Sequence, residues 1–233
     1  MIRDDYNKSV TPSRQLPADW PGYTNVQSLV AMAIPLFIFA STVCRFINDR
    51  KCGQPKDQLT KILKYETRSQ ASKLDATYLP VLEQLLARVT SSERRRLEDE
   101  FQQVIRSIVI LVSPLSATAL DRLLGVPKGT IDSKTDLLHS VLSIPFQPDH
   151  PIRLLHLSFR DFLVDSEKRE MNPFWVDEAY AHNKLATQCL DLLSTGDNLK
   201  KDICNLRTPK RPRSDIDRQT IDSHLPPDIQ YAC

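Results

Sequence analysis

The segment Arg153–Asp165, RLLHLSFRDFLVD, constrains the fold of this 233-residue chain more than any other stretch, because its hydrophobic period changes in the middle. The first half alternates between two faces as a β-strand does, and the second half follows helical spacing. Ser158 is placed to cap the new helix, and Asp161, three residues on, completes a capping-box-like pair. The pattern predicts that a buried strand ends and a helix begins at Ser158, with His156 just before the junction.

His156 has two interpretations on chemistry alone. An imidazole beside a helix N-terminus can contact a phosphate, because the free N–H groups and the helix dipole attract anions there. The alternative is a purely structural role as a hydrogen-bonded histidine of the core, since buried polar side chains are normally paired. The residue pattern leaves both open.

The preceding elements predict a winged helix. A helix from about residue 91, a short helix over residues 116–125 and a third from residue 130 are followed by a hairpin that pairs residues 142–146 with 152–157. This is the order of a helix-turn-helix with an appended strand pair, so the fold class is predicted to be mainly α, with a winged-helix domain flanked by helical segments. The expected helix caps are Ser91 or Ser92, Ser116 and Thr130, with Gly125 as the C-terminal stop of the short helix. The expected shared core is Ile108, Leu123, Leu138, Leu154 and Phe162.

Composition shifts divide the chain into four parts. Residues 1–24 form a polar lead-in, mostly unstructured. Residues 25–73 form a helical segment, residues 74–168 contain the winged helix, and residues 169–233 begin a second helical domain, which is expected to be truncated. Within the third part, a helix over residues 77–89 is expected to carry Pro80 in its first turn.

The most apolar run lies in the second part and is expected to be a core helix, broken or kinked at Pro35. A membrane span needs roughly 20 apolar residues. This run is shorter and meets Arg45 and Asp49, so a transmembrane segment is disfavoured, and no membrane partner is expected.

Glycine scarcity excludes one function. The chain has only five glycines, whereas a Walker A loop needs GxxxxGK followed by Ser or Thr so that backbone amides can surround the phosphates. The nearest sequence, GVPKGT at Gly125–Thr130, has the wrong spacing and no lysine after its second glycine. The chain cannot by itself be a P-loop ATPase, and no cofactor is expected for it alone.

The charge and the cysteine content argue against several other functions. A formal charge of +2 gives no general attraction to nucleic acid or to a membrane surface. Five cysteines without a CxxC pair, and without a signal peptide before them, favour reduced and mostly buried thiols in the cytoplasm. No His or Cys pair has zinc-site spacing, so no metal site is expected.

Several blocks of the chain resemble the fungal NACHT proteins of the vegetative (heterokaryon) incompatibility type, which are NLR-like, signal-transducing STAND NTPases. The matching blocks run through essentially the whole chain in one order: the early MIRDDYN…RQLPADWPG, MAIPLFIFASTVCRFI, TYLPVLEQLL, RLLHLSFRDFLVD, FWVDEAYAHNKLATQCLDLLS and HLPPDIQYAC. The resemblance implies that the chain covers only the region downstream of the NTPase core. The partners implied are that core, with its Walker A and Walker B motifs, and a C-terminal repeat domain; self-association is a further option.

The resemblance also implies two nucleotide-binding residues, both acting only together with the missing core. In such proteins a proline ahead of the winged helix packs on the adenine of ADP, and AIPL at Ala33–Leu36 makes Pro35 the match. A winged-helix histidine followed by Ser-Phe and an acidic-Phe pair contacts the β-phosphate in the inactive state, and HLSFRDF makes His156 the match. ADP or ATP is thus implied for the full-length family, while no catalytic or metal-binding residue is expected here.

The leading hypothesis is a non-catalytic regulatory segment that closes over ADP and transmits the activation switch in fungal self/non-self recognition. The alternative is a winged-helix DNA-binding protein. It is disfavoured because Lys128 and Lys134 are offset by Asp132 and Asp136, and no arginine lies in residues 131–146 to neutralise phosphates. A stand-alone hydrolase has no support, since no GxSxG elbow is present.

Overall fold

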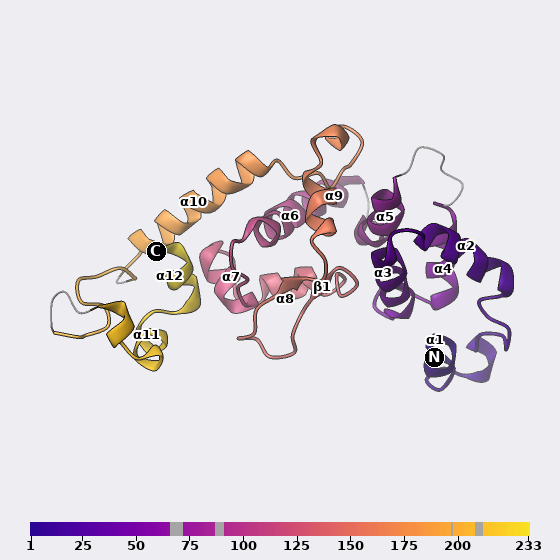
Figure 1. The fold of residues 1–233 in the computed structure, drawn as a ribbon, viewed down its shortest axis with the longest axis horizontal. Coiled ribbons are helices and arrows are strands. Elements are labelled where there is room, and N and C mark those ends of the chain that lie inside the picture. Colours follow the sequence, from indigo (N-terminus) through magenta and orange to yellow (C-terminus); the bar gives the residue numbers. More distant parts are fainter. Residues whose placement is uncertain (66–71, 87–90, 197, 208–211) are drawn as a thin grey trace. The chain divides into compact units, whose positions relative to one another are not determined.

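The computed structural model describes residues 1–65, 72–86, 91–196, 198–207 and 212–233, with the side chains at positions 91–98 and 213 left out of the description (Figure 1). The described chain is mainly α-helical and contains one two-stranded sheet. It divides into two compact units, each assembled from separate stretches of sequence. The first unit comprises Met1–Glu100, Thr135–Ser143 and Leu154–Trp175, and the second comprises Phe101–Lys134, Ile144–Arg153 and Val176–Cys233.

The expectation of an unstructured lead-in is wrong. Residues 1–22 contain α1 (Ile2–Asn7) and the short 3₁₀-helix η1 (Pro12–Arg14). Tyr6 and Leu16 are buried, and the Asn7 side chain bonds both the N–H (2.8 Å) and the C=O (3.0 Å) of Leu16. Two apolar side chains give this polar segment enough area to bury, which its average composition conceals.

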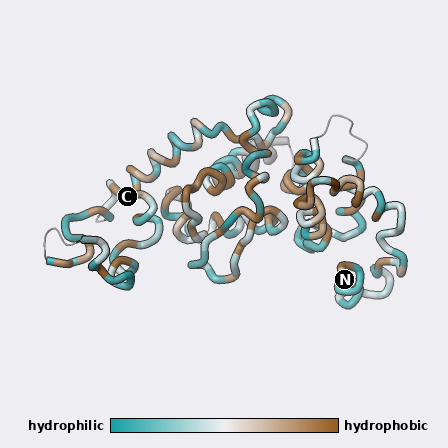
Figure 2. The backbone as a smooth tube through the Cα atoms, viewed as in Figure 1, coloured by the Kyte–Doolittle hydropathy of each residue, from teal (hydrophilic) through white to brown (hydrophobic). Residues whose placement is uncertain are grey.

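The apolar run folds as two helices, α2 (Tyr23–Ala33) and α3 (Phe37–Asn48), so the predicted break at Pro35 is confirmed. α3 packs against α1, α2, α4 (Pro55–Leu63) and α5 (Lys73–Leu86), and is the centre of the first unit (Figure 1). In Figure 2 hydrophobic residues concentrate on α3 and α5. Among the described residues no helix is both long and apolar enough to cross a membrane.

α5 begins earlier than the sequence pattern predicted, because Ser72 and Asp75 form a reciprocal capping box. The Ser72 hydroxyl accepts from the Asp75 N–H (3.2 Å), and the Asp75 carboxylate accepts from the Ser72 N–H (2.8 Å). The expectation that Pro80 lies in the first turn is therefore wrong; Pro80 lies inside the helix.

The predicted hairpin is confirmed, with shorter strands. β1 (Leu142–Ser143) pairs with β2 (Arg153–Leu154), and the Leu155 N–H donates to the Val141 carbonyl at 3.0 Å. The predicted change from strand to helix follows at α9 (Ser158–Val164), which packs against α5 and continues into the short 3₁₀-helix η2 (Ser166–Lys168). The capping role expected for Ser158 is wrong, because Ser158 is the first helical residue and Leu157 is the cap position.

The helices predicted before the hairpin are present as α6 (Ser91–Ile110), α7 (Ala117–Leu123) and α8 (Thr130–Thr135). Ser116 caps α7 as predicted, accepting from the Ala119 N–H at 3.2 Å. Gly125 ends α7 with a φ of +65°, and the N–H groups of Gly125 and Val126 bond the carbonyls of Arg122 and Asp121. This Schellman motif requires the left-handed backbone that glycine adopts without strain.

α8 is much shorter than predicted, and Thr130 is its first residue rather than its cap. The buried Asp121 carboxylate takes the capping role, accepting from the N–H groups of Gly129 (2.6 Å) and Ile131 (2.9 Å). After Thr135 the chain continues in tight turns, so Leu138 is buried from a turn and not from a helical face.

The second unit is completed by α10 (Glu178–Ser194), the 3₁₀-helix η3 (Arg213–Asp215), α11 (Arg218–His224) and α12 (Pro227–Ala232). Asp177 caps α10, accepting from the Tyr180 N–H at 3.0 Å. α12 packs on α7 and α10.

The five residues expected in one shared core are divided between the two units. Ile108 and Leu123 are buried in the second unit, Leu138 and Phe162 are buried in the first, and Leu154 is only half-buried. The domain limits at residues 74–168 stay a prediction.

Replacing Phe162 by alanine should lower the free energy of unfolding of the first unit by roughly 3–5 kcal/mol, because a fully buried ring leaves a cavity. Phe37→Ala is the matched control: the same residue type, in the same unit, but 83% exposed, so its cost should be within about 0.5 kcal/mol in the isolated chain. Urea unfolding followed by circular dichroism measures both. Equal costs for the two variants would contradict the placement of Phe162.

The carboxyl of Asp228, on α12, is 1% exposed, with Oδ2 3.2 Å from Nε of Arg122 on α7. Burial raises the pKa of Asp228, and Arg122 opposes this less strongly. The folded chain therefore binds this proton more tightly than the unfolded chain, so stability falls as the pH rises from about 3.9 through the raised pKa. Asp228→Asn does not titrate and should gain stability over wild type across that range in thermal unfolding. An advantage that shrinks as the pH rises would contradict the raised pKa.

Candidate functional site

His156 lies on the surface of the first unit, between β2 and α9. Its Nδ1 is 3.1 Å from the backbone nitrogen of Ser158 and 2.8 Å from the Ser158 hydroxyl oxygen. The imidazole thus bonds the first N–H of α9, as a helix cap would. Ser158 is the first residue of the helix and not its cap, and its hydroxyl lies beside the imidazole ring.

Tyr78 of α5 supports the same junction from below the surface. Its hydroxyl is 2.8 Å from the Ser158 hydroxyl, and its ring packs against Phe159 and Phe162 at centroid distances of 5.1 and 5.3 Å. Burial raises the pKa of Tyr78, so this hydroxyl keeps its proton at neutral pH. No sequence signal pointed to Tyr78, because it lies 80 positions before Ser158.

Pro35 is exposed in the short link between α2 and α3. Just before it, the last carbonyls of α2, Ala31 and Met32, accept hydrogen bonds from the Lys73 ammonium at 3.2 and 3.3 Å. A cation is favourable at a helix C-terminus, where carbonyls lack partners.

α5 therefore bonds the segments next to both predicted residues, Pro35 and His156. Lys73 and Tyr78 are five residues apart on α5, about 7.5 Å along its axis. One binds the end of α2 next to Pro35, and the other binds the junction that carries His156. Within the described part of the chain, no hydrogen bond or ion pair joins Pro35 to His156 directly.

An ion pair ties the segment after α9 to the start of α5. The Lys168 ammonium lies 2.5 Å from both the Asp75 carboxylate and the Ser72 hydroxyl. The side chains of Lys168 and Asp75 are 17% and 14% exposed. The α5 capping box is thus held against the end of the α9 segment, which fixes Tyr78 relative to Ser158.

Five large apolar side chains between the start of α2 and the first residue of α3 are exposed. We call this group the α2 face; its residues are Tyr23, Val26, Val30, Ile34 and Phe37. The expectation of a core helix is wrong for α2, in which Met32 is the one buried residue. No charged residue occurs from Tyr23 to Cys44. The absence of charge is the sequence feature that could have indicated an exposed apolar surface. It is equally compatible with a helix buried in the core of the chain.

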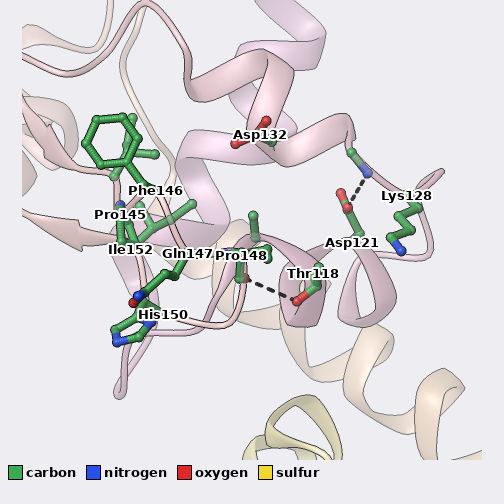
Figure 3. A pocket seen from close by; sticks show the side chains of 13 residues that line it. Thr118, Asp121, Lys128, Asp132, Pro145, Phe146, Gln147, Pro148, His150 and Ile152 are labelled. Carbon is green, nitrogen blue, oxygen red and sulfur yellow. Dashed lines mark hydrogen bonds between the residues drawn. The ribbon is translucent and has the colours of Figure 1, made fainter.

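A pocket of about 350 Å³ lies in the second unit, between α7 and the hairpin loop (Figure 3). Pro145, Phe146 and Ile152 line one side, and Lys128 and Asp121 line the other. Its buried carboxylate, Asp121, is already bonded to two N–H groups and serves to start α8. The pocket therefore offers mainly apolar walls.

The cysteines are free, as expected, but not mostly buried. Cys52 is buried, Cys189 and Cys204 are half-buried, and Cys44 and Cys233 are exposed. Burial, with the Asp49 carboxylate beside it, raises the pKa of Cys52 to about 12 and leaves that thiol unreactive. Among the described residues, no group of three or more His, Cys, Asp and Glu side chains is placed to hold a metal ion.

The chain was also compared with protein-family models, with curated proteins and with solved structures, and no match was found in any of the three comparisons. The family suggested by the sequence blocks therefore stays a prediction.

Lys168→Met should lower the free energy of unfolding of the first unit by about 1.5–3 kcal/mol, because it removes hydrogen bonds to a charged group from a largely buried position. Lys51→Met is the matched control, since Lys51 also pairs with an aspartate of the first unit, Asp136, but both side chains are about half exposed. Its cost should be about 0–1 kcal/mol. Denaturant titration of both variants measures the difference, and a larger cost for Lys51→Met would refute this role of Lys168.

Proposed function

We propose that the chain is the non-catalytic regulatory segment of a NACHT-type, signal-transducing NTPase of fungal self/non-self recognition, acting in the cytoplasm. The observation that carries the proposal is the exposed imidazole of His156, seated at the start of α9 and supported by the same helix that binds the segment before Pro35. The sequence blocks that resemble the NACHT proteins assign these two residues to the phosphate and the adenine of ADP.

The order of elements supports a winged-helix domain within this segment. α6, α7 and α8 precede the β1–β2 pair, as in a helix-turn-helix followed by a wing. A DNA-reading role is less well supported, because α8 has only six residues, and Asp132 within it opposes Lys134. A groove-reading helix needs length and phosphate-neutralising cations.

The position of His156 suits contact with an anion that arrives from outside the chain. Nδ1 is engaged by Ser158, and no bond to Nε2 occurs among the described residues, so the outer ring nitrogen is free for a ligand. The chain contains no glycine-rich loop that could surround phosphates, so nucleotide binding requires the NTPase core. His156 then adds one contact to a site built mainly by that core.

The α2 face supports the core as the partner. Tyr23 and Phe37 are 80% and 83% exposed, and Ile34, directly before Pro35, is 60% exposed. Large apolar side chains that are exposed and have no charged residue among them in the sequence are typical of the centre of a protein interface. Because this surface borders Pro35, a core docked on the α2 face would bring its nucleotide site next to that residue.

The test joins this chain to the NTPase core of an intact homologue and compares His156→Ala with the unmodified protein. A charge-assisted hydrogen bond to a phosphate contributes about 1.5–3 kcal/mol, so ADP affinity should fall roughly ten- to a hundredfold. His182→Ala, at an exposed histidine of α10, is the control and should retain wild-type affinity. Unchanged ADP affinity in His156→Ala would refute the phosphate contact.

The isolated chain provides the second arm of this experiment. Isothermal titration should detect neither ADP nor ATP binding to it, and His156→Ala should then change only folding stability. Low-micromolar binding by the isolated chain would contradict the dependence on the core.

A further inference from the structure

We propose that Tyr78 and Ser158 are positioning residues that hold His156 in the tautomer with its proton on Nε2, so that the imidazole presents a hydrogen-bond donor to an anionic ligand. The identity of that ligand, a nucleotide phosphate, rests on the proposed function. The tautomer and its two supporting residues rest on the geometry of this chain alone.

The backbone amide of Ser158 decides which nitrogen carries the proton. An amide N–H can only donate, and it lies 3.1 Å from His156 Nδ1. Nδ1 must therefore accept and cannot carry a proton while this bond is made. In the neutral ring the single proton is then on Nε2, the nitrogen that is free on the outer side.

The hydroxyl groups form a chain that reinforces this arrangement. Nδ1 is an acceptor with one lone pair, so the Ser158 hydroxyl, 2.8 Å away, is a second donor that shares this lone pair with the amide. The Ser158 oxygen is then available to accept from the Tyr78 hydroxyl, also at 2.8 Å. Each donor polarises the next, and the order Tyr78 to Ser158 to His156 satisfies all three groups with one proton arrangement.

The chain of hydroxyls starts from a rigid position. The Tyr78 ring is 1% exposed and packed against two phenylalanine rings of α9, so its hydroxyl has little freedom to move. Ser158 is the first residue of that same helix. A surface histidine is ordinarily free to rotate, but here its ring is fixed from the core outward.

His224 gives an internal standard for the opposite tautomer. Its Nδ1 lies 3.0 Å from the carbonyl oxygen of Thr220, one helical turn earlier. The Ser223 hydroxyl also lies 3.0 Å from this nitrogen, but it donates to the same Thr220 carbonyl at 2.9 Å. A carbonyl can only accept, so with the hydroxyl proton used in this way Nδ1 of His224 carries a proton. The two histidines should therefore give opposite patterns in a single spectrum of the same protein.

Long-range ¹H–¹⁵N correlation spectra of the full 233-residue chain, labelled with ¹⁵N-histidine, test the proposal. They are recorded near pH 8.5, where an ordinary imidazole, with a pKa of about 6.5, is neutral. His156→Ala and His224→Ala assign the signals. Nδ1 of His156 should resonate far downfield, as an unprotonated nitrogen does, and Nδ1 of His224 should not. A protonated Nδ1 at His156 would overturn the proposal.

Three variants separate positioning from packing. Tyr78→Phe keeps the buried ring, and Ser158→Ala keeps the helix and the backbone N–H of residue 158. Each variant breaks only the chain of hydroxyls, so each should shift the His156 Nδ1 resonance partway toward that of an unrestrained imidazole while the amide donor remains. Ser158→Thr retains the hydroxyl and should restore the wild-type spectrum. Tyr180→Phe, at an exposed tyrosine of α10, is the matched control and should leave His156 unaltered. Unaltered His156 signals in both Tyr78→Phe and Ser158→Ala would overturn the positioning role.

The same variants joined to an NTPase core connect the tautomer to the ligand. Tyr78→Phe should weaken ADP binding by about two- to tenfold, the effect of one neutral hydrogen bond, and by less than His156→Ala. Altered resonances with unchanged ADP affinity would support the positioning role and refute the phosphate contact. Weakened ADP binding with unaltered resonances would refute the positioning role.

Discussion

The first unit depends on Tyr78, a buried side chain that combines an apolar ring with a polar hydroxyl. Burying a large aromatic ring contributes roughly 2–3 kcal/mol, whereas a neutral hydrogen bond contributes about 1 kcal/mol. The packing of the Tyr78 ring therefore determines where its hydroxyl lies, and the hydrogen bond to Ser158 follows from that position. The orientation of His156 at the surface is in this sense a property of the core.

α5 carries this arrangement because three distant parts of the sequence are attached to its first turns. Lys73 binds the end of α2, the Ser72–Asp75 capping box binds Lys168, and Tyr78 binds the start of α9. The segment before Pro35 and the junction at His156 are thus both bonded to α5. A helix attached in this way can transmit a change at either segment to the other, since packed elements shift as rigid pieces.

The sequence predicted the features that depend on neighbouring residues. The break at Pro35, the Ser116 cap and the change from strand to helix before Ser158 are all local, and the structure has them. Predictions failed where a residue distant in sequence makes the hydrogen bond that a neighbouring residue was expected to make. Asp121 caps α8 from outside that helix, and Tyr78 reaches Ser158 from another element. For α2, periodicity identified an apolar face but not whether this chain covers it.

The uncharged α2 face also bears on how long such a chain persists in a cell. Exposed apolar surface is what chaperones and quality-control proteases recognise. A copy whose α2 face lacks a partner displays Phe37 and Tyr23 continuously, even when every helix is correctly formed. With the proposed NTPase core as that partner, abundance would follow the supply of the core more than folding stability.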